Sequence, residues 1–268
     1  RDRSVSRGLG DVYKRQDIDR SMTENVKRYR QGMEQFKEYV EMWIHEIKLP
    51  IASLTLMLHN NMDKCDKEFA DRMNTQIRRI NNYIEQILYY VRSENAEKDY
   101  IINESKLSKI ISAVALKNKD DLLENNITFE VSNADKIVLT DAKWMEFMLN
   151  QIVSNSIKYK DKTKAESYIK ISAAEDKKCI VLEILDNGIG INASDLPRVF
   201  DKSFTGENGH EYSKATGMGL YIVKKLCDKL GSKVSIESVN GEYTRVKITF
   251  YKNDFYKEIT DSNESGSM

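Results

Sequence analysis

The sequence predicts an α+β protein in two parts. The first is a helical hairpin that dimerises into a four-helix bundle, and the second is an α/β sandwich with a mixed sheet and helices on one face. Two observations predict this. Apolar residues recur at helical spacing between residues 40 and 91. Beyond residue 106, segments in which apolar and polar residues alternate, as in strands, are interspersed with helical segments. Of the 268 residues, 40% are hydrophobic, which is enough to build a core.

The beginning of the chain carries neither pattern. The string RDRSVSRGLGDVYKRQ has no helical or strand period, so we interpret residues 1–16 as a non-native scar with no part in the predicted fold. Residues 17–35 are polar and compatible with a helical lead-in. On this interpretation the native N-terminus is missing, together with any membrane segments that it held. The longest nearly apolar stretch, residues 49–58, is shorter than the roughly 20 residues that a membrane helix needs.

Residues 36–95 contain two helical runs joined by a polar loop. The apolar positions of the first recur at steps of three and four residues, and those of the second form a heptad seam of Met73, Ile77, Ile80, Ile84, Ile87 and Val91. One hairpin cannot cover both of its apolar faces, whereas a second copy of itself would, which predicts a homodimer. The alternative is an intramolecular bundle against the C-terminal half of the chain.

A polar linker at 96–106 precedes the second part, residues 107–252. Its predicted strands are 127–131, 136–140, 168–174, 179–185, 233–239 and 244–250, and its predicted helices cover about 107–124, 142–159 and 218–230. The last two strands form a hairpin, with a turn at Asn240-Gly241. Residues 253–268 are a polar tail.

Charge and cysteine content exclude some classes of function. The 42 basic and 42 acidic side chains balance, so no global field favours nucleic acid, and we expect no nucleic-acid partner. The three cysteines, Cys65, Cys179 and Cys227, lie far apart, form no metal-binding spacing and fit a reducing cytosol.

The string WIHEIKLPI places a histidine, His45, beside the apolar seam and within reach of solvent. An imidazole is a good nucleophile near neutral pH, and the adjacent Glu46 can orient it and accept its proton. Pro50 removes a helical hydrogen bond and permits a bend. A lone helical histidine is more often a surface or packing residue, and His59 and His210 lack any such context. The pattern His-Glu-x-Lys-x-Pro, however, resembles the H-box of sensor histidine kinases.

The string LNQIVSNSIKYK contains four polar residues that share one face of a predicted helix: Gln151, Asn155, Lys158 and Tyr159. An amide oxygen suits Mg²⁺, for which we select Asn155, and a nearby lysine suits phosphate. The alternative is that this face is simply solvated. The chain has no GxxxxGK[ST] string, which excludes a P-loop.

Two glycine-containing motifs follow. In DNGIGI, Asp186 ends a strand and can accept a hydrogen bond from an adenine amino group, while Gly188 and Gly190 let the backbone turn sharply and approach the base. In TGMGLYIVKKL, Gly217 and Gly219 precede a helix whose N-terminal N–H groups can bind phosphate. A plain helix-entry turn is the alternative for this last motif.

Together these strings resemble the N, G1 and G2 boxes of the ATP-binding domain that histidine kinases share with gyrase-type topoisomerases, the ninety-kilodalton chaperones and mismatch-repair ATPases. The string LPRVFDKSFTGENG resembles the F-box and the start of the ATP lid. VFDKSFTGENG and TGMGLYIVKKLCDKLG are similar to the intramembrane-sensing, peptide-antibiotic-responsive branch of histidine kinases. The resemblance implies further ATP-binding residues, Phe204, Thr216 and Leu220.

The resemblance implies that ATP, with Mg²⁺, phosphorylates His45, and that the phosphoryl group then passes to an aspartate of a response regulator. It also implies a chain on the cytoplasmic side of the membrane, with a transporter or sensor subunit as a further partner through the missing N-terminal region.

Three departures from the family pattern modify this expectation. Gln151 stands where hydrolytic relatives place a water-activating Glu, which argues against a hydrolytic ATPase or a topoisomerase-like domain. Phe200 and Phe204 are one residue further apart than in many F-boxes, and the lid, residues 205–216, is short. Leu49 stands where many relatives have Thr or Asn to position water, which predicts weak phosphatase activity. The remaining rival is a non-catalytic dimeric binding module, which the intact motif residues disfavour.

Overall fold

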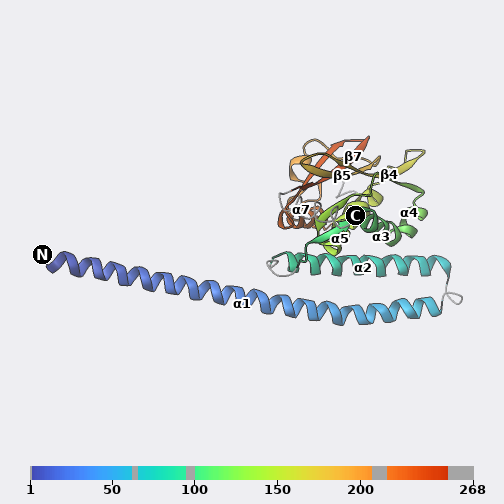
Figure 1. The fold of residues 1–268 in the computed structure, drawn as a ribbon. Coiled ribbons are helices and arrows are strands. Elements are labelled where there is room, and N and C mark those ends of the chain that lie inside the picture. The colour runs from blue at the N-terminus through green and yellow to red at the C-terminus, as the bar shows by residue number, and fades with distance from the viewer. Residues whose placement is uncertain (1, 62–65, 95–99, 207–215, 253–268) are drawn as a thin grey trace, which may run out of the picture. The chain divides into compact units, whose positions relative to one another are not determined.

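The computed structural model describes residues 2–61, 66–94, 100–206 and 216–252 (Figure 1). The chain divides into two compact units, Arg1–Asn95 and Ala96–Met268.

The first unit is a hairpin of two long helices, α1 (Asp2–Asn60) and α2 (Lys67–Glu94). The backbone of α1 is helical from Asp2, so the segment interpreted as a scar continues into the predicted lead-in without a break. Pro50 lies inside α1, and the helix continues through it to Asn60. The bend that a proline permits therefore does not interrupt the helix in this structure.

The heptad pattern explains how the two helices of the hairpin pack. One row of residues, spaced by seven, is buried between them: Ile44, Ile51 and Leu58 from α1, and Ala70, Ile77 and Ile84 from α2. The neighbouring row stays exposed, with Ile47 37%, Ile80 42%, Leu54 46% and Ile87 50% exposed. The predicted seam of α2 thus separates into a row packed within the hairpin and a row left uncovered on a single chain.

The second unit is built on a five-stranded sheet in the order β2-β4-β5-β7-β6, in which β2 and β4 are parallel and the other pairs antiparallel. Its strands are β2 (Ile127–Ser132), β4 (Ser167–Glu175), β5 (Cys179–Asp186), β6 (Ser232–Val239) and β7 (Tyr243–Tyr251). A separate antiparallel pair joins β1 (Asn103–Lys106) to β3 (Ile137–Thr140). The predicted mixed sheet is confirmed.

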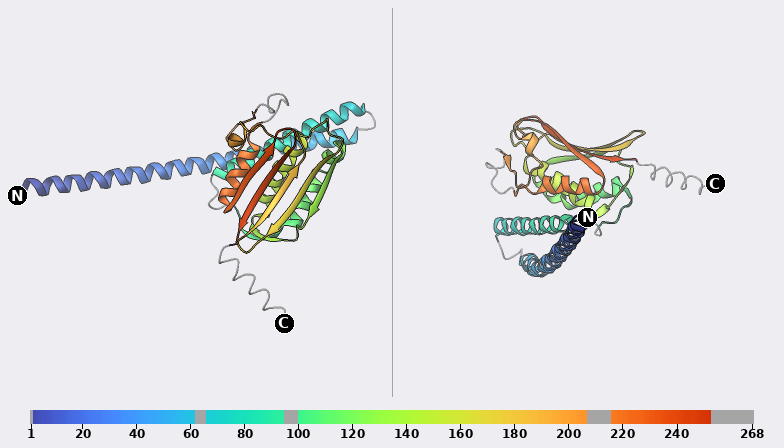
Figure 2. Two further views of the ribbon diagram at one scale, coloured as in Figure 1. Left: turned by 90° about the horizontal axis from the view of Figure 1, so that it is seen from above. Right: turned by 90° about the vertical axis from the view of Figure 1, so that its left-hand side faces the viewer.

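Helices cover one face of this sheet, as Figure 2 shows. They are α3 (Leu107–Lys117), α4 (Lys119–Glu124), α5 (Ala142–Lys158) and α7 (Gly219–Lys229). The strands alternate accordingly: in β5, Ile180, Leu182 and Ile184 are buried, while the residues between them are half-exposed. Because side chains alternate along a strand, one side of each strand faces the helices and the other faces solvent.

Two local features differ from the sequence-based expectation. The predicted helix over 107–124 is broken at Asn118, whose buried amide donates to Val114 O and to Asn150 Oδ1, both at 2.8 Å. The predicted linker at 96–106 contains β1, which pairs with β3 from Asn103 opposite Thr140 to Lys106 opposite Ile137. Both features include a partner more than 30 residues away, Asn150 for Asn118 and β3 for β1, and local periodicity does not report such partners.

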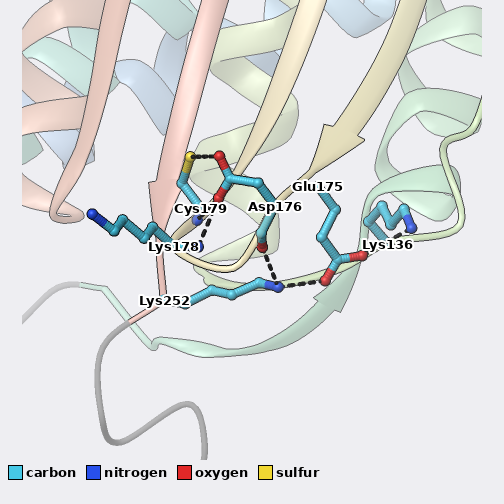
Figure 3. A network of polar contacts seen from close by, with 6 residues as sticks. All are labelled: Lys136, Glu175, Asp176, Lys178, Cys179 and Lys252. Carbon is cyan, nitrogen blue, oxygen red and sulfur yellow. Dashed lines mark hydrogen bonds and ion pairs between the residues drawn. The ribbon is translucent and has the colours of Figure 1, made fainter.

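A polar network closes the end of the sheet where β4 turns into β5 (Figure 3). Glu175 forms ion pairs with Lys136 at 2.8 Å and with Lys252 at 2.6 Å. Lys252 also donates to the backbone carbonyl of Asp176 at 2.9 Å. The network therefore links the β4–β5 turn to the segments next to β3 and β7.

Candidate functional site

The candidate site lies at the opposite end of β5, around its last residue, Asp186. The carboxylate is 8% exposed. Its Oδ2 accepts a hydrogen bond from the Ser156 hydroxyl at 2.7 Å, and its Oδ1 accepts one from the Gly188 N–H at 2.9 Å. A carboxylate offers about four lone-pair positions, so these two bonds leave Asp186 able to accept from a further donor.

Burial raises the pKa of Asp186 above its usual value, and the hydrogen bonds from Ser156 and Gly188, with the charge of Lys164, partly oppose that rise. A carboxyl group whose pKa is perturbed by burial in this way marks a candidate functional site. The position of Asp186 at a strand end, next to a loop, matches the sequence-based prediction.

The loop after Asp186 packs backbone against backbone. A Cβ on Gly188 would lie 2.5 Å from the carbonyl oxygen of Tyr159, and one on Gly190, where φ is +68°, would lie 2.1 Å from that of Val239. The Ile189 N–H donates to Tyr159 O at 3.0 Å, and Ile189 O accepts from the Gly241 N–H at 2.7 Å. Both glycines are therefore required by contacts within the protein, a reason in addition to the predicted approach to a base.

Helix α5 contributes the polar face predicted from the sequence. Gln151 is 6% exposed, and its Oε1 lies 3.1 Å from where a Cβ on Gly219 would stand, which brings it to the start of α7. Asn155 and Lys158 follow at intervals of four and three residues and are half-buried, and α5 ends at Lys158. The burial of Gln151 disfavours the alternative that this face is merely solvated.

Tyr159 follows α5 directly. Burial raises the pKa of its phenol, and the Lys158 ammonium lies 5.0 Å from its ring centroid. Its carbonyl holds the loop after Asp186, so this residue joins the end of α5 to the candidate site.

The entry to α7 is tightly packed against residues of the predicted F-box. Gly217 has φ of +64°, and a Cβ there would lie 2.4 Å from the carbonyl carbon of Ser203. The Thr216 hydroxyl accepts from the Met218 N–H at 3.3 Å, and Leu220, in the first turn of α7, is half-buried. The N-cap residue, Met218, makes no side-chain capping hydrogen bond to α7, and the N–H groups of a helix N-terminus are suited to an anion.

Phe204 lies beside this entry. Its half-buried ring has the Arg198 guanidinium 4.5 Å from its centroid. Phe204 also lines a cavity of about 400 Å³, together with Asp195, Arg198 and residues 201–206. Residues 207–215, most of the predicted lid and His210 among them, lie outside the described residues.

His45 and Glu46 belong to the helical unit. Both side chains are exposed on α1, directly after the buried Ile44. His45 therefore lies beside the packed row of the hairpin and is accessible, as expected from its position next to the seam.

Three residues around Asp186 were not predicted. Ser156 stands four residues after the buried Ile152, at a position of α5 where the pattern calls for an apolar residue. A polar residue in an apolar stripe needs a buried partner, so this signal was readable. Asn187 accepts from the Tyr168 N–H at 2.9 Å and donates to Glu166 O at 2.8 Å. Lys164 binds backbone carbonyls of the loop, and nothing in its sequence context singles it out.

The described residues contain no group of three or more His, Cys, Asp or Glu side chains that could hold a metal ion. None of their helices is long and apolar enough to cross a membrane. Of the cysteines in the described ranges, Cys179 is half-exposed and Cys227 buried, and both are free.

The second unit carries the sequence of a known family of ATPase domains. Residues 140–254 match the family described as histidine kinase-, DNA gyrase B-, and HSP90-like ATPase. Among solved structures, the Acinetobacter baumannii histidine kinase AdeS shares the fold, with a TM-score of 0.55 and 19% identity over 78% of this chain and 98% of that one. Full-length ShkA, solved in complex with AMPPNP, also shares the fold, with a TM-score of 0.60 and 16% identity. The match covers 80% of this chain and 46% of ShkA.

Curated relatives place the chain more narrowly. It is 32% identical to the sensor histidine kinase YxdK of Bacillus subtilis, over 79% of this chain and 64% of that one. It is 31% identical to the sensor protein BceS of Halalkalibacterium halodurans, over 89% of this chain and 70% of BceS. The chain belongs to the sensor histidine kinases, the family predicted from its sequence. It spans 64% of the length of YxdK and 70% of the length of this BceS.

Proposed function

We propose that this chain uses ATP to phosphorylate its own His45 and then passes the phosphoryl group to an aspartate of a response regulator. The observation that carries the proposal is the buried Asp186 carboxylate, which has two internal donors and unused acceptor positions. A buried acceptor of this kind suits the amino group of adenine, because an exposed one would be satisfied by water.

The other residues of the site are assigned by their positions around Asp186. Lys158 and the N-terminus of α7, which Gly217 and Gly219 form, offset phosphate charge. Nucleotide contacts are also assigned to Gln151, Tyr159, Gly188, Gly190, Phe204, Thr216 and Leu220, which border the same loop, helix entry or F-box cavity.

Asn155 is assigned to Mg²⁺. Its amide oxygen is a hard ligand on the half-buried face of α5, one turn before Lys158. Mg²⁺ takes few protein ligands and keeps several waters, so a single amide fits it. When bound with the phosphates, the ion neutralises charge on them.

The chemistry at His45 requires a nucleophilic nitrogen and a base. One imidazole nitrogen forms a bond to the γ-phosphorus while the bond from that phosphorus to the ADP oxygen breaks, and Glu46 accepts the imidazole proton. Gln151 is an amide and cannot activate water as a base, so transfer to His45 is favoured over hydrolysis.

The uncovered row of the hairpin supports a homodimer. Ile47, Leu54, Ile80 and Ile87 are each at least 37% exposed on one chain, and a second hairpin would cover them as in a four-helix bundle. Sedimentation should show a dimer, and Ile87→Glu should dissociate it. Leu116→Glu, at an exposed residue of the other unit, is the control and should leave the dimer intact. A monomeric wild-type chain would contradict this assignment.

We also propose weak phosphatase activity, because Leu49 is 56% exposed and has no group to position water one turn after His45. Leu49→Thr should raise the rate at which the chain dephosphorylates its response regulator in the presence of ADP. Rapid dephosphorylation by the wild type, with no gain in the variant, would rule this out.

By family resemblance, the chain acts on the cytoplasmic side of a membrane, with a transporter or sensor subunit as a further partner.

Incubation with γ-labelled ATP and Mg²⁺ tests the central reaction. An acid-labile, base-stable label should appear on the chain and be absent from His45→Gln. His59→Gln is the matched control, because His59 is also an exposed histidine of α1, and it should be labelled like the wild type. Equal labelling of His45→Gln would reject His45 as the acceptor, and steady ATP turnover with no labelled protein would indicate a hydrolytic ATPase instead.

A further inference from the structure

Lys164 lies in the segment between α5 and β4 and has no role in the reaction described above. Its ammonium donates to three backbone carbonyls: Asn187 O at 2.8 Å, Gly188 O at 3.3 Å and Glu242 O at 2.8 Å. A lysine has three N–H donors. All of them are therefore used within the protein, on the loop after Asp186 and on the turn between β6 and β7.

Two of these carbonyls belong to peptide units that form the site. In the first unit, Asn187 supplies the C=O that binds Lys164, and Gly188 supplies the N–H that donates to Asp186 Oδ1 at 2.9 Å. In the second, Gly188 supplies the C=O and Ile189 supplies the N–H that donates to Tyr159 O at 3.0 Å. Because a peptide unit is planar, holding its C=O also fixes the direction of its N–H. Lys164 thus acts on the donor that orients the Asp186 carboxylate.

The segment that carries Lys164 is itself ordered by hydrogen bonds. The Asp161 carboxylate accepts from both the backbone N–H of Thr163 at 2.9 Å and its hydroxyl at 2.6 Å. Such a turn directs the following residue, and Lys164 is half-buried, whereas Lys162 in the same segment is exposed. The two lysines therefore differ in environment, although they are two positions apart.

We propose that Lys164 is a positioning residue for recognition of the adenine base: it holds the peptide units after Asp186 so that the carboxylate presents its free acceptor to the amino group of the base. This inference rests on the proposed ATP-binding role of Asp186. It assigns Lys164 no contact with phosphate, because its donors are occupied by carbonyls.

The test compares ATP with purine riboside triphosphate, which lacks the 6-amino group, as ligands of the full chain. The wild type should bind ATP about 10-fold more tightly than the analogue, as expected for one hydrogen bond to a charged acceptor. Lys164→Met should lose about 10-fold in affinity for ATP and less than about 2-fold for the analogue, because the lost interaction is with the amino group. The kcat for His45 labelling should be unchanged at saturating ATP.

Two further variants complete the experiment. Lys162→Met removes an exposed lysine from the same segment and should match the wild type with both ligands. Lys164→Gln keeps two N–H donors and should retain about half of the discrimination in free-energy terms, or about 3-fold. It carries the test if the methionine variant does not fold.

The outcomes separate the two levels of the proposal. Equal losses for ATP and the analogue in both Lys164 variants would overturn the positioning role while leaving Asp186 as the base acceptor. Equal affinities of the wild type for the two ligands would overturn the adenine assignment of Asp186 and the Lys164 inference with it.

Discussion

The two ends of β5 carry polar networks of similar size but opposite character. At one end, Asp186 is 8% exposed and receives one donor from Ser156 and one from a backbone N–H. At the other, the Glu175 side chain is 35% exposed and pairs with two lysines, Lys136 and Lys252 (Figure 3). Burial raises the pKa of Asp186, whereas the hydrogen bonds from Lys136 and then Lys252 lower that of Glu175.

The difference shows which network is suited to a ligand. Glu175 is satisfied by its own cations and by water, so it has little to gain from a further partner. Asp186 is buried, and its two donors in the described part of the chain are a hydroxyl and a backbone N–H. The nearby Lys164 ammonium binds the neighbouring carbonyls. Such an acceptor costs stability in the free protein, and that cost is offset when a donor binds.

The largest expected effect is at the buried carboxylate. Asp186→Asn should weaken ATP binding about 100-fold, or roughly 3 kcal/mol, because an amide offers the adenine amino group a weaker acceptor or a competing donor. Calorimetric titration with ATP would measure the loss. An affinity within 2-fold of the wild type would show that Asp186 does not recognise the ligand.

The same variant should not lose stability. The folded-state pKa of Asp186 lies above its unfolded value, so its ionised form destabilises the fold at neutral pH, and this cost disappears as pH falls through the folded pKa. The Ser156 hydroxyl can rotate to accept from the new amide. Urea unfolding at pH 7 should therefore find Asp186→Asn as stable as the wild type or more so, and a lower stability would contradict this account.

The next effect comes from the backbone contact beside Asp186. Gly190→Ala and Gly231→Ala both place a Cβ on a left-handed residue, with φ of +68° and +70°, at a shared cost of about 1 kcal/mol. Only at Gly190 would the new Cβ meet another atom, Val239 O, at 2.1 Å. Gly190→Ala should therefore destabilise the second unit by at least about 2 kcal/mol more than the control. Equal urea midpoints for the two variants would show that the close packing is not required.

A smaller effect is expected at the hydroxyl that binds Asp186. Ser156→Ala should weaken ATP binding about 10-fold, since a hydrogen bond to a charged group is lost. Ser156 lowers the pKa of Asp186, so without it ATP affinity should fall away at a higher pH as the solution is acidified. Ser154→Ala, a half-buried serine of the same helix, is the control. A midpoint that stays in place or moves to lower pH would contradict the assigned hydrogen bond.

The smallest effect is expected at the exposed end. Glu175→Gln should cost at most about 0.5 kcal/mol in stability, a loss that disappears at high salt, and should leave ATP affinity unchanged. Because the folded-state pKa of Glu175 is lowered, its contribution is present above the unfolded value and is lost as pH falls through the folded one. Urea unfolding at low and high salt would measure it, with the exposed Glu166→Gln as control. If Glu175→Gln weakened ATP binding, the conclusion that only the network around Asp186 is suited to a ligand would be wrong.

The sequence alone determined the elements that carry the site and most of the residues assigned to it. Every strand of the five-stranded sheet begins and ends within one residue of its predicted bounds, because alternation along a strand records which side faces the core. The same local information placed Asp186 at a strand end, the Gln151 face on a helix and His45 beside a packed row. The heptad spacing predicted the hairpin because it records which side of each helix is packed.

Only the tertiary structure decided which groups meet. Ser156 reaches Asp186 across 30 residues, Asn118 reaches Asn150 across 32, and Lys164 reaches Glu242 across 78. It also separated the predicted seam of α2 into a packed row and an exposed one. Periodicity reports whether a side chain turns toward the interior, but hydrogen-bond partners depend on how distant segments pack, and a lysine on an irregular connection carries no periodic signal at all.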